Sequence, residues 1–87
     1  MSLDVAEFFR LLPIALAGRR YSTAKNHVTV KDGDRRIRIT LTPQPDLRVA
    51  SLTLPRTLVE FAFEGYLPDD AVRFTEHFLR HYQRGGG

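Results

Sequence analysis

The stretch RIRITLT at residues 36–42 alternates apolar and polar side chains along its whole length. Ile37 and Ile39 fall on one side of a strand, because successive side chains of a strand point to opposite faces. A similar alternation recurs in RVASLTL at 48–54 and in LVEFAFE at 58–64. Three such segments predict an antiparallel sheet with a polar face and an apolar face that another layer must cover.

A further strand is predicted at residues 27–31, after a loosely structured segment that begins at Arg19. The turn sequence Asp32-Gly33-Asp34 follows, and its glycine supplies the positive φ that tight hairpins need, so this strand should pair with the next one. The prolines of 43–46 predict a loop, and Pro55-Arg56 should separate the third strand from the fourth. The short connections favour an antiparallel meander.

A helix is predicted before the sheet. Apolar residues recur there at helical spacing: Val5, Phe9, Leu12 and Leu16. Ser2 or Asp4 can cap its start, and Gly18 can cap its end. Pro13 lacks a backbone donor and its ring clashes with the preceding turn, so we expect a kink or break near Leu12, with one more turn to Ala17.

A second helix is predicted after the sheet, with Pro68 at its first position and Asp69 and Asp70 in its first turn. Its apolar side carries Ala71, Phe74, Phe78 and Tyr82. The basic side chain of Arg84 suits the end of the helix, and glycines follow at 85–87.

These elements predict one α+β domain over residues 1–84, followed by a flexible glycine tail at 85–87. Its order is αββββα. The expected fold is a two-layer sandwich, a four-stranded antiparallel sheet with two helices on one face, because that arrangement buries every apolar face.

Composition limits the classes of function. The chain has 87 residues, thirteen basic and ten acidic, with a net charge of +3. It has no cysteine, which excludes a disulfide framework and a thiolate site and indicates a cytoplasmic protein. Asp4 and Glu7 lie near the start without a basic cluster, so no signal peptide is expected. No apolar run approaches the roughly 20 residues that span a bilayer, so no membrane partner is expected.

The polar face of the sheet is the candidate binding surface. Its proposed residues are His27, Lys31, Arg36, Arg38, Thr40 and Glu60. Three interpretations remain open for this face. It can be a solvated surface on which arginines and glutamates pair across strands, an interface with a protein partner or a second copy, or a nucleic-acid contact.

In the nucleic-acid interpretation Lys31, Arg36 and Arg38 would neutralise phosphates. Single-stranded RNA binders with an open sheet place aromatic rings on it for base stacking. Here Phe61 and Phe63 share the face of Val59, which should be buried. The pattern therefore argues against base readout.

No catalytic constellation is recognisable, so the sequence predicts no enzyme, no cofactor and no metal site. None of the three serines lies in a nucleophile-elbow context, and no glycine-rich loop joins a strand to a helix. His77 and His81 lie four residues apart and share one helix face, a spacing that can hold a metal. Without convergent ligands they are interpreted as ordinary histidines at the edge of the apolar stripe.

The glycines at 85–87 resemble the tail of ubiquitin-like sulfur carriers, but those proteins reach their tail from a strand and this chain reaches it from a helix. The segments LPRT at 54–57, FEGY at 63–66 and YQRGGG at 82–87 resemble a set of short uncharacterised bacterial proteins. The resemblance covers the second half of the chain. It implies that the glycine tail is native, and it implies no activity.

The sequence therefore predicts a non-enzymatic binding or assembly module that associates with itself or docks a protein partner through the open polar face. The alternative is a nucleic-acid-binding protein that uses the same basic residues together with Arg19 and Arg20. A carrier protein that acts through its C-terminal glycines is the remote alternative.

Overall fold

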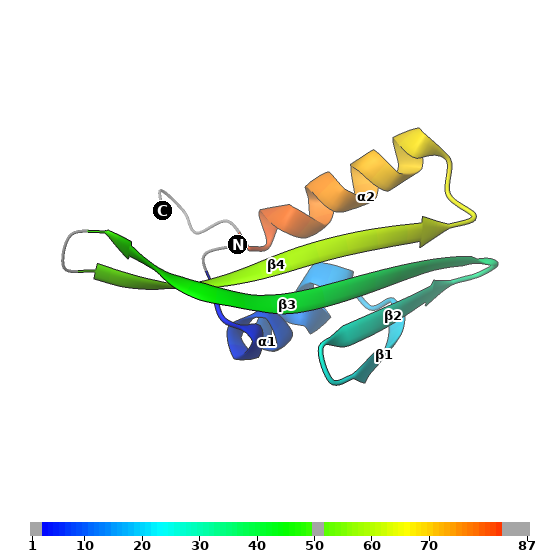
Figure 1. Cartoon of the computed structure of the whole chain (residues 1–87). Helices are drawn as coiled ribbons and strands as arrows, with labels where there is room; N and C mark the ends of the chain where they lie inside the picture. The colour runs from blue at the N-terminus through cyan, green and yellow to red at the C-terminus, as the bar shows by residue number, and fades with distance from the viewer. Residues whose placement is uncertain (1–2, 50–51, 83–87) are drawn as a thin grey trace.

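The computed structural model describes residues 3–49 and 52–82. In chain order the elements are α1 (Val5–Leu16), β1 (Arg20–Ala24), β2 (His27–Asp32), β3 (Arg35–Val49), β4 (Leu52–Glu64) and α2 (Pro68–Arg80) (Figure 1). The predicted α+β class and the order αββββα are confirmed. Several strands, however, begin and end at residues other than those expected.

The four strands form one antiparallel sheet in the order β1-β2-β3-β4, which is the predicted meander. Asp32 and Arg35 are opposite each other, so the hairpin predicted at Asp32-Gly33-Asp34 is present, with Gly33 and Asp34 as its two turn residues. Gly33 has φ +64°, in the left-handed region that glycine adopts without a steric penalty. The turn between β1 and β2 places Lys25 in the same region, with φ +53°.

One face of the sheet is apolar. Two rows cross it, Val30–Ile37–Phe63 and Val28–Ile39–Phe61. Phe8 of α1 and Phe78 of α2 are fully buried, and their ring centroids lie 6.0 Å apart. The Phe78 ring also meets the Phe61 ring edge to face at 5.4 Å. Both helices therefore cover the same face of the sheet, as predicted.

Helix α1 starts as predicted, with the Asp4 carboxylate accepting a hydrogen bond from the Glu7 amide at 2.7 Å. The predicted break at Pro13 is not found, because α1 runs through Pro13 for one more turn, to Leu16. The proline is exposed and lies one turn from the helix end, so its missing donor affects a single interior bond while Leu12 and Leu16 remain buried in the core. Ala17, with φ +53°, closes the helix before Gly18.

The predicted third strand at 48–54 and the predicted loop at 43–46 are both wrong. β3 continues through Pro43 and pairs with β4, where Pro43 lies opposite Thr57. A register shift between Gln44 and Leu47 accommodates one extra residue on β3, as a β-bulge does. Residues 48–49 end β3 and 52–54 begin β4, so the predicted strand spans their connection, and residues 50 and 51 lie outside the described part.

Pro55-Arg56 was predicted to separate two strands but lies inside β4. The Leu41 amide donates to the Asn26 carbonyl at 2.8 Å, and beyond Leu41 β3 no longer pairs with β2. From there β3 and β4 form a two-stranded arm that extends beyond the rest of the sheet (Figure 1). Prolines are tolerated in this arm because its outer edges need no ladder hydrogen bonds.

The base of the arm is tied to the start of the chain. Thr57 is buried, and its hydroxyl donates to the Leu3 carbonyl at 2.7 Å. Leu3 itself is buried. This contact joins residues 54 positions apart and fixes the segment before α1 against β4.

Helix α2 begins at Pro68, as predicted, and ends at Arg80, one turn before the predicted Arg84. Beyond it the Tyr82 hydroxyl donates to the Phe8 carbonyl at 3.0 Å, which ties the end of α2 to α1. Burial raises the pKa of the Tyr82 phenol well above its ordinary value. The predicted tail at 85–87 lies outside the described residues.

Candidate functional site

The polar face of the sheet carries the candidate site, and strand register decides which side chains share it. Its described members in the four-stranded part of the sheet, which we call the open face, are Arg20, Ser22, Ala24, His27, Thr29, Lys31, Arg36, Arg38, Thr40, Glu60, Ala62 and Glu64. Both helices lie on the opposite side of the sheet, so no described helix covers this face.

All six residues predicted for the site are on the open face. His27 lies opposite Thr40, which in turn lies opposite Glu60. The Thr40 hydroxyl and the His27 Nδ1 are 3.5 Å apart. Lys31 lies opposite Arg36, and Arg38 is the next outward-facing residue along β3. The alternation of the sequence was therefore enough to place these residues together.

Arg20 also lies on the open face, although it was not part of any predicted strand. It lies on β1, opposite Lys31, because the segment RYSTA at residues 20–24 forms an edge strand of the sheet, where a loosely structured segment was expected. Every residue of β1 is exposed, so the strand has no apolar alternation. The signal that could have found it is the two-residue turn Lys25-Asn26, because asparagine is frequent in such turns.

The open face is basic over three strands. Arg20, Lys31 and Arg36 form one row from β1 to β3, with neighbouring strands about 4.8 Å apart, and Arg38 lies two residues further along β3. We call these four residues the basic cluster. All four are exposed. Only Glu64, at the β4 end of the row, and Glu60 bring negative charge to the described face.

The solvated-surface interpretation calls for arginine–glutamate ion pairs across strands, and none is found among the described residues of the open face. The described ion pairs within 4.0 Å join Arg10 to Glu7, Arg35 to Asp32, and Arg35 and Arg73 to Asp70. None of these involves the basic cluster, even though Arg36 lies opposite Glu64. The cluster therefore presents positive charge that no described carboxylate neutralises.

The described open face also lacks phenylalanine and tyrosine. Phe61 and Phe63 project to the apolar side, as predicted, where Phe63 meets Phe74 of α2 at 5.9 Å. Tyr21 lies opposite Val30 and so belongs to the apolar side as well. A base-stacking platform, which needs exposed rings on the sheet, is missing from the described face.

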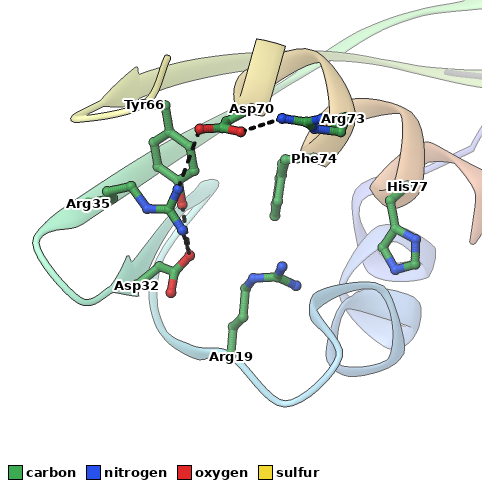
Figure 2. A pocket seen from close by; sticks show the side chains of 8 residues that line it. All are labelled: Arg19, Asp32, Arg35, Tyr66, Asp70, Arg73, Phe74 and His77. Atoms are coloured by element: carbon green, nitrogen blue, oxygen red, sulfur yellow. Dashed lines mark hydrogen bonds and ion pairs between the residues drawn. The ribbon is translucent and has the colours of Figure 1, made fainter. Parts of the chain in front are cut away.

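A second site lies at the end of the sheet near the start of α2. It is a pocket of about 230 Å³, which we call the Arg35 pocket, and its lining residues are Arg19, Asp32, Arg35, Tyr66, Asp70, Arg73, Phe74 and His77 (Figure 2). They come from the segment after α1, the β2–β3 hairpin, the segment after β4 and α2. No alternation or helical period of the sequence indicates this grouping.

Arg35 organises one wall of the pocket. Its guanidinium contacts the Asp32 carboxylate at 2.9 Å and Asp70 at 3.9 Å, and lies 4.5 Å from the centre of the Tyr66 ring. The Tyr66 hydroxyl donates to Asp32 at 3.3 Å, and Arg73 binds Asp70 at 2.7 Å. Burial, reinforced by the nearby Asp32 charge, raises the pKa of the Tyr66 phenol.

Metal-ligating residues do not converge in the described part of the chain. The His77 and His81 rings lie 5.2 Å apart, edge to face, and no group of three or more histidine, cysteine, aspartate or glutamate side chains suited to a metal occurs in residues 3–49 and 52–82. Within the same ranges no helix has the length and apolar character needed to cross a membrane.

Comparison with known proteins adds no assignment. No protein-family model matches the chain, and neither the curated proteins nor the solved structures contain a significant match to it.

Proposed function

We propose that the protein is a non-enzymatic binding module that docks an acidic protein partner through the open face. The observation that supports this function is the basic cluster, in which four exposed cations share one side of the sheet without a described carboxylate partner. The absence of cysteine suits a cytoplasmic location for such a module.

The arrangement of the cluster favours a partner of opposite charge. Lys31 lies directly opposite a cation on each neighbouring strand, Arg20 and Arg36. Like charges opposite each other in a sheet destabilise it. An acidic surface that lies over the row would remove this repulsion on binding, and complementary charge also speeds association.

A second copy of the chain is a less suitable partner for this face. Two copies related by a twofold axis would present the same surface to each other. The central strands β2 and β3 carry Lys31, Arg36 and Arg38, so face-to-face packing would bring these cations toward their own counterparts. We therefore place the partner among acidic proteins, and treat self-association through the open face as the less favoured mode.

Nucleic acid is the second candidate partner, and the basic cluster is again the observation that favours it. Four cations that neutralise four phosphates would give a salt dependence with a slope of roughly −3.6 on a double-logarithmic plot. Glu60 and Glu64 lie on the same face and would repel phosphates, and no described phenylalanine or tyrosine is placed for stacking. These features favour a protein surface, which can match mixed charges.

The test is an amide nuclear magnetic resonance titration of labelled protein with a poly-glutamate peptide, a short DNA duplex and a single-stranded RNA, each at low and moderate salt. We expect saturable, salt-sensitive shifts around Lys31, Arg36 and Arg38 with the peptide. The triple variant Lys31→Gln/Arg36→Gln/Arg38→Gln should lose them. The matched control is Arg10→Gln/Arg80→Gln, which removes exposed cations from the helices, and it should keep most of the binding.

The outcomes separate the two candidates. Tighter binding of either nucleic acid than of the peptide would transfer the assignment to nucleic acid. Two results would overturn the role of the open face. One is that these amides do not shift with any of the three probes, and the other is that the control variant loses as much binding as the triple variant. Sedimentation at increasing concentration adds a check, because association that the triple variant retains cannot arise from the basic cluster.

A further inference from the structure

The Arg35 pocket lies on the side of the sheet that carries the helices, so it is separate from the open face. Arg35 is held between two aspartates, and each aspartate has a second partner, Tyr66 for Asp32 and Arg73 for Asp70. Both carboxylates are therefore already engaged by donors within the pocket. The lining holds three arginines and two aspartates, so one positive charge is in excess.

Arg19 supplies that excess charge. It takes part in none of the ion pairs of the described residues. Its guanidinium donates to the Leu16 carbonyl at 3.2 Å and lies 5.3 Å from the centre of the Phe74 ring. A guanidinium has five N–H donors, so most of them remain for a ligand. Figure 2 shows the Arg19 side chain reaching up into the pocket beneath Phe74.

The position of Arg19 is set by the fold. The helix ends at Ala17 with a left-handed residue, Gly18 follows with φ +82°, and the Arg19 amide donates to the Leu16 carbonyl at 3.1 Å. The same carbonyl receives the guanidinium. This tight reversal directs the side chain toward α2 before β1 begins, and contacts with a carbonyl and a ring reduce the ordering needed on binding.

We propose that the Arg35 pocket binds a small organic carboxylate, with its anionic group at Arg19 and its flat or apolar body against Phe74 and Tyr66. A single negative charge matches the single excess positive charge. A phosphate dianion would bring more charge close to Asp32 and Asp70. The volume of about 230 Å³ lies below the usual range of pockets for drug-sized ligands, so the ligand is small.

The experiment is an amide titration with benzoate, in which benzamide serves as the uncharged analogue and inorganic phosphate as the competing anion. We expect benzoate to cause saturable shifts at Gly18, Arg19, Tyr66 and Phe74, and benzamide to cause none. Arg19→Gln should weaken benzoate binding about tenfold or more, because a charge-assisted hydrogen bond is lost. Arg10→Gln removes the same charge from the exposed side of α1 and should leave the affinity unchanged.

Three results would overturn the proposal: no saturable shift with benzoate into the tens of millimolar, equal shifts with benzamide, or tighter binding of phosphate than of benzoate. Arg19→Gln also removes the contact with Leu16, so its spectrum must first show a folded chain. If it does not fold, the contrast between benzoate and benzamide on the unmodified protein decides. The open face takes no part in this site. A negative benzoate titration would therefore not bear on the proposed docking function, and a negative peptide titration would not bear on the Arg35 pocket.

Discussion

Lys31 lies between two cations, so replacing it with glutamate should stabilise the fold. Arg20 on β1 and Arg36 on β3 are its direct neighbours across the sheet. Side chains directly opposite in an antiparallel pair have Cβ atoms about 5 Å apart, which keeps their charged ends within reach of each other. Lys31→Glu turns two repulsive pairs into two attractive ones, and Lys31→Gln only removes the repulsion.

The register gives the size of the effect. At a charge separation of about 6 Å in water, each pair contributes roughly 0.7 kcal/mol without salt, and about half of that at physiological ionic strength, where the Debye length is about 8 Å. After allowance for side chains that move apart, Lys31→Gln should raise the free energy of unfolding by about 1 kcal/mol at low salt, and Lys31→Glu by about 2 kcal/mol.

The assay is urea denaturation followed by circular dichroism, at low salt and at high salt. For a chain of this size, a gain of about 2 kcal/mol should also raise Tm by roughly 10 °C. The control is Arg56→Glu, an equal change of charge on β4 at a residue that lies opposite the neutral Gln44. It should change the free energy of unfolding by less than about 0.5 kcal/mol, as most surface substitutions do.

Two results would refute the reasoning. Lys31→Glu could leave the protein equally stable or less stable at low salt, or its gain could persist undiminished at high salt, where surface charges are screened. If the gain is found, the same variant should bind an acidic partner poorly. Stability and binding would then oppose each other at one residue, as they often do at functional sites.

Three further predictions concern the packing of the two layers. Thr57→Val removes the hydroxyl that donates to the Leu3 carbonyl and should lower the free energy of unfolding by about 1–2 kcal/mol in urea titrations, whereas Thr57→Ser keeps the donor and should retain that hydrogen bond. Phe78→Ala empties a fully buried position and should cost about 3–5 kcal/mol; a loss below about 1 kcal/mol would contradict the described core. The raised pKa of Tyr82 means that the unfolded chain loses this proton first, from about pH 10. The contribution of Tyr82 to stability should therefore be constant below pH 10 and fall above it by up to about 1.4 kcal/mol per pH unit. Tyr82→Phe should make this alkaline decline shallower in urea titrations between pH 9 and 11.

Local patterns were enough to predict much of the fold. Alternation in 36–42 and the turn at Gly33 predicted the central hairpin, and its register then placed the predicted site residues on one face. The predictions that failed are those in which tertiary structure overrides a local sequence rule. The prolines at 43–46 are unsuited to the interior of a sheet. At these residues, however, β3 has left the four-stranded region and continues in the two-stranded arm, with a bulge.

The remaining errors have a similar cause. Pro13 would break the middle of a helix, but one turn from the end of α1 the packing of Leu16 outweighs the lost bond. The Arg35 pocket was beyond prediction for a different reason. Its walls come from four separate segments, and Arg19 and Phe74, whose side chains meet there, lie far apart in the sequence. No periodicity within a local stretch of sequence predicts a contact between residues so far apart.

The contact between Phe8 and Phe78 has a consequence for synthesis of the protein in the cell. These rings belong to α1 and α2, so the apolar side of the sheet stays uncovered on its α2 side until α2 has been translated. At about 5–20 residues per second, the ribosome needs roughly 4–14 s to travel from one to the other. Until α2 arrives, the residues of the sheet that Phe78 covers, Phe61 among them, have no second helix to pack against, so the hydrophobic core closes only after α2 has been translated.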